Sequence, residues 1–239
     1  MFNIIHLDSV DSTNKYCMKN LKHLNNGDVV YTTKQIAGYG RYNREWINTK
    51  NNLTFSIVLK PKIKIKVLPT ITQYAAITIV KLLEAMNIDA SIKWPNDVLV
   101  KNKKIAGILT QTSLQGNQTK GIVIGIGLNI GMDDNDINVI DQPATAINLE
   151  QSDNVDTNTC LKQLLDIFFQ DLNNFYQSGF PFIKSYYQKK STNIGKQIKI
   201  KLHSEEINGF AEDINNDGSL QIVTDSGKKQ NIDIGEIMF

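Results

Sequence analysis

Four apolar, β-rich segments in the middle of the chain constrain its fold more than any other feature. They span residues 91–94, 98–100, 105–111 and 121–130. Short runs rich in β-branched residues and bounded by turn residues are typical of strands, so we predict a central sheet. Further strand-like runs lie before them, at residues 4–7, 29–33 and 53–59. A chain of 239 residues is long enough to bury such a sheet in a globular core.

Apolar residues also recur with helical spacing on either side of these strands. This spacing predicts a short helix over residues 13–21 and a longer one over 69–86. Two amphipathic helices are predicted over residues 161–176 and 180–189, whereas residues 131–156 are acidic and lack periodicity. Helices and strands together indicate an α/β (α+β) fold with a central sheet.

The pattern changes near residue 190. From Gly195 onward, short strand-like runs alternate with turn signals at Asp217-Gly218 and Ser226-Gly227, which predicts a small all-β unit. We therefore predict two domains, residues 1–190 and 191–239.

Composition excludes several classes of protein. The net charge is only +2, whereas a dedicated nucleic-acid binder has a large excess of basic residues. The chain contains no run of 18 apolar residues, so no membrane span is predicted. The amino terminus has no secretory signal, so we expect a cytoplasmic protein. Two widely spaced cysteines and three scattered histidines form no metal or redox motif, and we expect both cysteines to be structural thiols.

Two motif-like segments do not support the function that they suggest. Residues 213–218 match the first half of a calcium loop, but Thr224 stands where the bidentate Glu belongs, so we predict a hairpin turn. Gly125 and Gly127 begin a dinucleotide-like glycine pattern, yet the third glycine is misplaced and no helix pattern follows.

The polar stretch over residues 35–52 predicts a long loop with an anion-binding composition. Gly38 and Gly40 let backbone amides approach an anion, and Arg41 and Arg44 supply fixed, delocalised charge suited to phosphate. Trp46 offers an aromatic face for a base or packs beneath the loop. A solvated loop with incidental arginines is the alternative explanation.

A second group of charges follows a predicted strand. Lys93 and Asp97 flank the turn Trp94-Pro95-Asn96, and Lys104 lies on the next strand-like run. These three side chains are expected around one pocket, as two cations for carboxylate and phosphate oxygens and one acid for a metal or an amine. Exposed lysines and a turn aspartate would explain the same pattern.

Glycines within a predicted buried strand indicate that something packs directly on the backbone. At Gly125 and Gly127 this is either a flat apolar ligand or a neighbouring element of the protein.

Four segments, taken in the order in which they follow along the chain, resemble the pattern of the biotin protein ligase family. The resemblance rests on Ser12-Thr13-Asn14, on the loop from Gly38 to Trp46, on KWPND (residues 93–97) with KIAGIL (104–109), and on GIGLN (125–129). Residues 209–218 and Gly235-Glu236 are similar to the SH3-like domain of that family. Two loop positions depart from the family pattern: Tyr39 stands where arginine is common, and Asn43 where glycine is frequent.

The resemblance implies an α/β fold with a mixed sheet like that of class II aminoacyl-tRNA synthetases, followed by an SH3-like barrel. It implies two steps, in which biotin and Mg-ATP form biotinyl-5'-AMP and a lysine of a carrier domain then takes the biotinyl group. The expected protein partner is the biotin carboxyl carrier domain of a biotin-dependent carboxylase. No DNA-binding domain and no DNA partner are expected, because the resemblance begins at residue 12. No membrane partner is expected either, because the chain has no run of 18 apolar residues. A homodimer is left open.

The same resemblance assigns roles to individual residues. The expected biotin-binding residues are Ser12, Thr13, Asn14, Gln35, Gly38, Arg41, Lys104, Gly107, Gly125 and Gly127. The expected ATP and adenylate contacts are Arg41, Arg44, Trp46, Lys93 and Asn129. The expected catalytic residues are Arg41, Lys93, Asp97 and Lys104. Mg²⁺ is expected to arrive on the ATP phosphates, with Asp97 as a candidate ligand.

Two alternatives remain at this point. A lipoate-type ligase would use the same chemistry on another acid, but the polar set Ser12, Thr13 and Gln35 suits a ureido group better. A non-catalytic biotin-binding module would lack ATP chemistry, and the charges at Arg41, Lys93 and Lys104 argue against it.

Overall fold

The structure, a computed structural model, describes residues 2–49, 51–61, 70–116, 118–152, 155–202 and 205–238. The strands are β1 (Asn3–Leu7), β2 (Asp28–Thr32), β3 (Asn51–Leu59), β4 (Ser91–Lys93), β5 (Asp97–Val100), β6 (Lys103–Gln115), β7 (Gln118–Gly131), β8 (Gln197–Lys201), β9 (Glu206–Ile214), β10 (Leu220–Thr224), β11 (Lys229–Ile232) and β12 (Glu236–Met238). The helices are α1 (Thr13–Lys19), α2 (Ile71–Ala85), α3 (Asp134–Val139), α4 (Ile147–Glu150), α5 (Thr157–Gln170), α6 (Leu172–Ser178) and α7 (Lys184–Lys190), with 3₁₀ turns η1 (Arg41–Asn43) and η3 (Phe180–Phe182).

The chain forms two compact units that are described separately. The first contains residues 1–65 and 100–163, and the second contains residues 66–99 and 164–239. The units are not continuous in sequence, and the domain boundary expected at residue 190 stays a prediction. No described helix has the length and apolar character needed to cross a bilayer.

A mixed sheet forms the framework of the first unit. Its strands follow the order β1-β2-β3-β7-β6, with β1 parallel to β2 and the other neighbours antiparallel. Directly opposite residues of an antiparallel pair face the same side, so Ser56 of β3 and Gly125 of β7 share one face. Gly127 of β7 and Gly107 of β6 are likewise opposite each other. The expected mixed α/β fold is confirmed.

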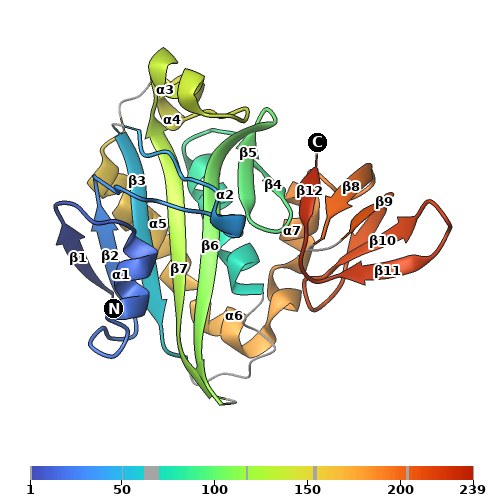
Figure 1. Cartoon of the computed structure of the whole chain (residues 1–239), viewed down its shortest axis with the longest axis horizontal. Coiled ribbons are helices and arrows are strands. Elements are labelled where there is room, and N and C mark those ends of the chain that lie inside the picture. Colours follow the sequence, from blue (N-terminus) through green and yellow to red (C-terminus); the bar gives the residue numbers. More distant parts are fainter. Residues whose placement is uncertain are drawn as a thin grey trace. The chain divides into compact units, whose positions relative to one another are not determined.

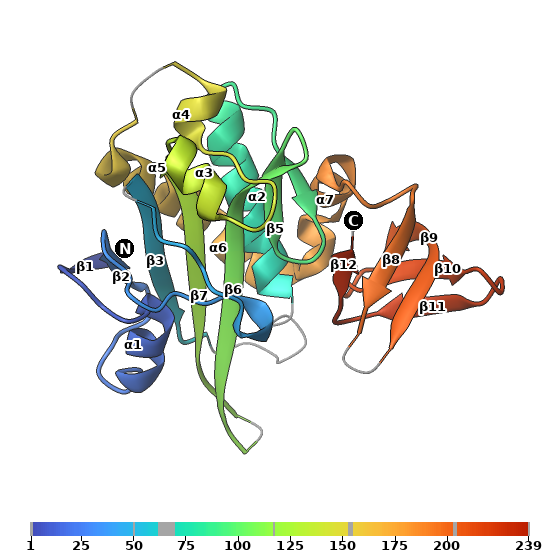
Figure 2. The ribbon, with the colours of Figure 1, turned by 45° about the horizontal axis from the view of Figure 1, so that its top comes forward.

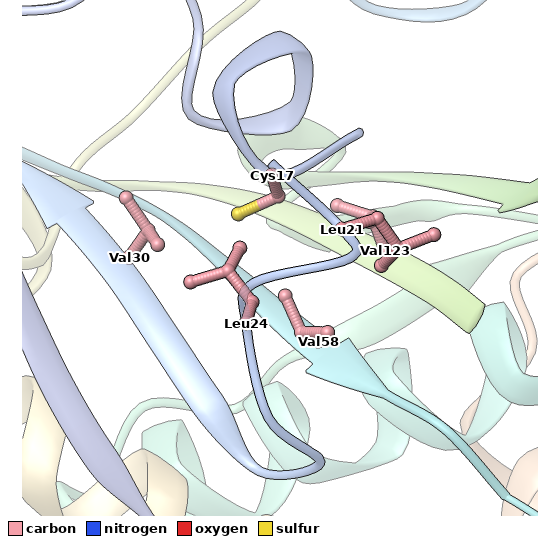
Figure 3. Packing of buried hydrophobic residues seen from close by; sticks show 6 residues of the cluster. All are labelled: Cys17, Leu21, Leu24, Val30, Val58 and Val123. Atoms are coloured by element: carbon pink, nitrogen blue, oxygen red, sulfur yellow. The ribbon is translucent and has the colours of Figure 1, made fainter. Parts of the chain in front are cut away.

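A small apolar cluster holds α1 and the chain after it against this sheet (Figure 3). Cys17 of α1 packs with Leu21, Leu24, Val30, Val58 and Val123, all of which are buried. Burial raises the pKa of the Cys17 thiol to about 12, so the group stays protonated and acts as a small apolar side chain. This packing fixes the first turn of α1, where Thr13 and Asn14 lie, over the sheet.

The second unit combines helices with a separate antiparallel sheet. The β4–β5 hairpin pairs Lys93 with Asp97, and Tyr74 of α2 stacks on Phe175 of α6 with ring centroids 4.6 Å apart. The carboxy-terminal strands form an antiparallel sheet in the order β11-β10-β9-β8-β12. Figures 1 and 2 show these five strands in orange and red as the predicted small β unit.

Two details differ from the sequence-based expectation. The acidic stretch over residues 131–156 contains α3 and α4, which have six and four residues and are too short to show periodicity. The helix predicted over 161–176 is two helices, α5 and α6, separated at Asp171. The Asp171 carboxylate pairs with Lys81 of α2 at 3.3 Å, an interaction that the local pattern does not encode.

Candidate active site

The first turn of α1 carries a buried polar group. Ser12 is the N-cap, and its hydroxyl accepts a hydrogen bond from the Lys15 amide at 3.4 Å. The Thr13 amide donates to Oε1 of Gln35 at 3.0 Å, and the Thr13 hydroxyl lies 3.3 Å from the same oxygen. Ser12 and Thr13 are both almost fully buried, so this capped turn presents fixed polar atoms in a dry setting.

Both polar atoms of the Asn14 side chain form hydrogen bonds with other protein groups. Its Nδ2 donates to the Leu109 carbonyl at 3.0 Å and to Gln111 Oε1 at 3.2 Å. Its Oδ1 lies 2.6 Å from the hydroxyl of Ser56, a buried residue that sequence analysis did not single out. The structure therefore gives Asn14 a role in joining α1 to β3 and β6, and its contact with biotin stays a prediction.

Three of the four glycines predicted to contact biotin lie on β6 and β7 under side chains of the protein itself. A Cβ atom at Gly127 would overlap the indole of Trp46, and one at Gly107 would lie 3.2 Å from the same ring. A Cβ atom at Gly125 would overlap the Asn14 amide. Sequence analysis left a ligand and a protein group as alternatives, and in this structure protein side chains cover the glycines.

The loop after β2 crosses β7 and reaches β6 (Figures 1 and 2). Two backbone hydrogen bonds link the two halves of this loop. The Trp46 amide donates to the Gly38 carbonyl at 3.0 Å, and the Gly40 amide donates to the Arg44 carbonyl at 2.8 Å. Its tip has positive φ at Asn43 (56°), a conformation that favours glycine and that asparagine tolerates. The family departure at position 43 is therefore compatible with the geometry of the loop.

The other departure, Tyr39, ties this loop to the sheet. Its hydroxyl donates to Gln111 Oε1 of β6 at 3.1 Å, and the Lys15 ammonium lies 5.1 Å from its ring centroid. Gln111 also binds Asn14, so Tyr39 connects the loop to the polar group at α1.

The predicted arginines lie at the tip of the loop. The Arg41 guanidinium lies 5.2 Å from the ring centroid of Tyr42, and Arg44 is exposed. Delocalised cations of this kind can bind a phosphate when the loop lies against a nucleotide.

A pocket lies between the loop and the segment after α3. It is lined by Glu45, Trp46, Ile47, Lys104, Asn129, Ile140, Asp141, Gln142 and Ala144. The segment over residues 140–144 was not predicted as part of the site, because it is an irregular stretch without a motif. Three of the predicted residues, Trp46, Lys104 and Asn129, do meet here.

Lys104 is fixed in this pocket through its backbone. Its amide donates to the Pro143 carbonyl at 2.8 Å, and its carbonyl accepts from the Thr145 amide at 2.9 Å. Asn129 donates to the Thr145 carbonyl at 2.9 Å and holds the same segment. The Lys104 ammonium lies 5.8 Å from the Trp46 ring centroid, where it can meet an anion bound over the glycines.

The indole nitrogen of Trp46 stands out in this pocket. It is buried and has no hydrogen-bond partner among the residues that the structure describes. A buried N–H group without a partner costs free energy, and such groups are rare in native proteins, so this one needs a physical explanation.

Lys93 and Asp97 belong to the second unit and lie at the ends of the β4–β5 turn. Both are half-buried, and Asn96 donates to the Asp97 carboxylate at 3.2 Å. Trp94 anchors this turn, because its amide donates to Asn193 Oδ1 at 2.9 Å and its indole N–H to the Gly218 carbonyl at 3.2 Å. The roles expected for Lys93 and Asp97 stay predictions.

The described residues include no group of three histidine, cysteine, aspartate or glutamate side chains arranged to hold a metal ion. They therefore offer no preformed protein cage for Mg²⁺.

Comparisons with known proteins agree with this arrangement. The model of the Biotin/lipoate A/B protein ligase family matches residues 7–129, and the Biotin protein ligase C terminal domain matches residues 194–239. The bifunctional ligase/repressor BirA of Bacillus subtilis is 30% identical over 85% of this chain, which spans 64% of that protein's length. The biotin--[acetyl-CoA-carboxylase] ligase of Paracoccus denitrificans is 28% identical over 98% of this chain and 99% of its own.

Solved structures give the same result. The biotin protein ligase from Aquifex aeolicus has a TM-score of 0.81 and 25% identity, covering 100% of this chain and 98% of its own. The same enzyme in complex with biotin and ATP has a TM-score of 0.79 and 25% identity, covering 99% of this chain and 97% of its own. The fold, the matched ranges and the residues of the loop and sheet agree, and the chain belongs to the biotin/lipoate A/B protein ligase family.

Proposed function

We propose that this chain is a biotin protein ligase. In the first step, the biotin carboxylate attacks the α-phosphate of ATP, which gives biotinyl-5'-AMP and releases pyrophosphate. In the second step, a lysine amine of a biotin carboxyl carrier domain attacks the acyl carbon, and AMP leaves. The observation that carries this proposal is a polar group in which buried Ser12 and Thr13 lie beside half-buried Gln35. The same sheet carries Gly107 and Gly127, and Lys104 lies next to Gly107.

The biotin end of the site combines the neutral side chains of Thr13 and Gln35 with the cation of Lys104. Thr13 and Gln35 suit the ureido ring, because each can donate or accept a hydrogen bond. The flat surface over Gly107 and Gly127 suits the apolar ring and chain once the Trp46 indole moves aside. Lys104 then neutralises the carboxylate, since a buried anion without a partner is costly.

The nucleotide end uses the loop and the pocket beside it. Arg41 and Arg44 neutralise phosphate, Trp46 gives the base an aromatic face, and Asn129 holds the neighbouring segment. We assign Lys93 to the phosphate, as the family resemblance implies. When bound with the ATP phosphates, Mg²⁺ would supply further charge neutralisation there.

The acceptor end involves Asp97. We assign this carboxylate to the incoming lysine or to Mg²⁺, because it lies beside a turn and is half-buried. We retain residues 191–239 as a separate SH3-like domain, which the family match over residues 194–239 supports. We also propose a cytoplasmic location, because two buried, free cysteines suit a reducing compartment.

The direct test is the intact mass of a carrier domain after incubation with the chain, ATP, Mg²⁺ and biotin. We expect the carrier to gain one biotinyl group, and to gain nothing when ATP is omitted. A parallel reaction with lipoate in place of biotin tests the alternative of a lipoate ligase, because the matching family model covers ligases of both acids. Transfer of lipoate but not biotin would contradict the proposal, as would binding of biotin without any transfer.

A further inference from the structure

We propose that the turn over residues 215–219, which connects β9 to β10, is a positioning element for Lys93 and Asp97, and that it acts through the Gly218 carbonyl. This role rests on the proposed function, because it takes Lys93 and Asp97 as the groups that meet the ATP phosphate and the incoming lysine. The sequence pattern over residues 213–218 predicted only a hairpin turn, with no part in the reaction.

Hydrogen bonds within the 215–219 turn fix the direction of the Gly218 carbonyl. Asp217 Oδ1 accepts from the Ser219 amide at 3.0 Å and from the Ser219 hydroxyl at 2.6 Å. The Asn215 amide donates to the Ser219 carbonyl at 2.9 Å, and the Gly218 amide donates to the Asn215 carbonyl at 3.0 Å. These bonds do not use the Gly218 carbonyl, so the turn presents this oxygen to the residues packed beside it.

The Gly218 carbonyl accepts two hydrogen bonds from buried side chains. Gln73 of α2 donates through Nε2 at 2.8 Å, and Trp94 donates through its indole N–H at 3.2 Å. A carbonyl oxygen has two lone pairs and can therefore satisfy both donors. Gln73 and Trp94 are almost fully buried, so water has no access to replace the carbonyl if the turn moves away.

Trp94 connects this contact to the charged residues. It directly follows Lys93, which the β4–β5 hairpin pairs with Asp97. Gly218 holds the indole of Trp94 and Asn193 holds its amide, from positions 124 and 99 residues later in the chain. A displacement of about 1 Å at a reacting group can lower a rate on the order of 100-fold, so this anchoring should matter for catalysis.

The close approach of the turn to α2 requires a glycine at position 218. The φ of Gly218 is +81°, in the left-handed region that favours glycine. A Cβ atom there would overlap Gln73 Oε1 and lie 2.6 Å from Thr70 Cγ2. Gln73 would have to move, and it would then lose its hydrogen bond to the turn. An alanine at position 218 should therefore also displace the carbonyl from Trp94.

Gly227 offers a matched control in the same sheet. It lies in the turn between β10 and β11 with a φ of +82°, and a Cβ atom there would meet nothing within 4 Å. Gly218→Ala and Gly227→Ala therefore impose similar backbone strain, but only the first disturbs Gln73 and Trp94. A difference in catalysis between the two variants reports the contact and not the strain.

The test measures biotin binding and both catalytic steps in each variant. We expect Gly218→Ala to lower biotin-stimulated ATP–pyrophosphate exchange and single-turnover transfer to a carrier domain on the order of tenfold, per biotin bound. Its Kd for biotin in the absence of ATP should stay within about twofold of the parental value, because the residues assigned to biotin lie in the first unit. Gly227→Ala should keep both rates within about twofold. Equal rates in the two variants, or a loss of biotin affinity as large as the loss of rate, would overturn the proposal.

Trp94→Phe provides a second test if Gly218→Ala does not fold. Phenylalanine keeps an aromatic ring but has no N–H donor, so this variant should slow both steps and leave the Kd for biotin unchanged. In the Trp94→Phe background, Gly218→Ala should lower the rates by less than about threefold, because Trp94 no longer transmits the effect. Parental rates in a folded Trp94→Phe variant, or equal losses from Gly218→Ala in both backgrounds, would contradict the proposal.

Thermal unfolding identifies the variants that are folded at the temperature of the assay. If the parental chain shows no biotin-stimulated exchange, the proposed function fails, and the role of the turn fails with it. If the parental chain is active but the variants at Gly218 and Gly227 have equal rates, only the role of the turn fails.

Discussion

The two tryptophans of the chain lie in opposite environments. Trp94 in the second unit is 1% exposed, and both its amide and its indole nitrogen donate hydrogen bonds. Trp46 in the first unit lies on glycines at the edge of a pocket, and its buried indole nitrogen has no partner among the described residues. The same residue type thus serves once as scaffold and once in a site that can change its partners.

This difference indicates that Trp94 contributes mainly to the stability of the fold, whereas Trp46 contributes mainly to ligand binding. Packing and satisfied hydrogen bonds around Trp94 hold the turn that carries Lys93 and Asp97. The loop that carries Trp46 is half-buried or exposed at every position from 39 to 47, which is typical of segments that move when a ligand binds. Substitutions at the two positions should therefore change different properties.

The largest expected effect is on stability. Trp94→Ala removes a fully buried indole and should destabilise the fold by about 3–5 kcal/mol. Trp46→Ala should cost less than about 1 kcal/mol, because the ring is partly exposed and its N–H is unsatisfied. Urea unfolding of both variants measures the comparison. Equal destabilisation at the two positions would remove the distinction between them.

The next effect concerns biotin binding in the first unit. Lys104→Ala should weaken biotin binding on the order of tenfold or more, because a charge-assisted contact contributes about 1.5–3 kcal/mol. Lys101→Ala is a matched control, since Lys101 is exposed and pairs with Glu150 at 2.8 Å outside the pocket. Titration calorimetry with biotin gives both values. A loss at Lys101 as large as the loss at Lys104 would exclude a specific role.

A loop effect of similar size is expected at Arg41. Arg41→Gly removes a cation from the loop and should speed the escape of biotinyl-5'-AMP, whose mixed anhydride the closed loop protects from water. Freed adenylate would acylate lysines of an added bystander protein. The measurement is biotin on that bystander, with adenylate retention followed by rapid gel filtration. Full retention without stray labelling in an active variant would show that the loop does not guard the intermediate.

The smallest effect should follow from Tyr39→Phe. This change removes the hydroxyl that donates to Gln111 at 3.1 Å, an interaction of about 1 kcal/mol, and leaves the ring in place. The loop should open more often, so trypsin should cleave after Arg41 or Arg44 several-fold faster without a change in global stability. An unchanged cleavage rate would mean that Tyr39 does not tie the loop to β6.

Much of this arrangement could be predicted from the sequence, because the informative residues are close together in the chain. The family, the mixed sheet and the long loop after β2 follow from local motifs and the resemblance that they carry, and the comparisons confirm the family. The glycine pattern predicted close packing at Gly125 and Gly127. It could not tell whether a ligand or the protein packs there, because both require the same missing side chains.

Other parts of the site had no local signal. Ser56 lies in an apolar strand, and its partners are distant residues that only the fold brings near. Gln111 is similar, since it meets Asn14 and Tyr39 from a strand 97 and 72 positions away. The short helices α3 and α4 and the break at Asp171 depend on capping and on long-range pairing.

The most direct measurement of the central claim is ATP–pyrophosphate exchange in the presence of a candidate acid. The account predicts that biotin stimulates exchange and that lipoate does not, because only biotin offers a ureido group to the polar side chains of Thr13 and Gln35. Exchange reports only the first step, in which Arg41, Lys93 and Lys104 are the assigned residues. The carrier takes no part in this step, so exchange should need no carrier protein. Equal stimulation by lipoate, or none by biotin in a chain that binds it, would contradict the account.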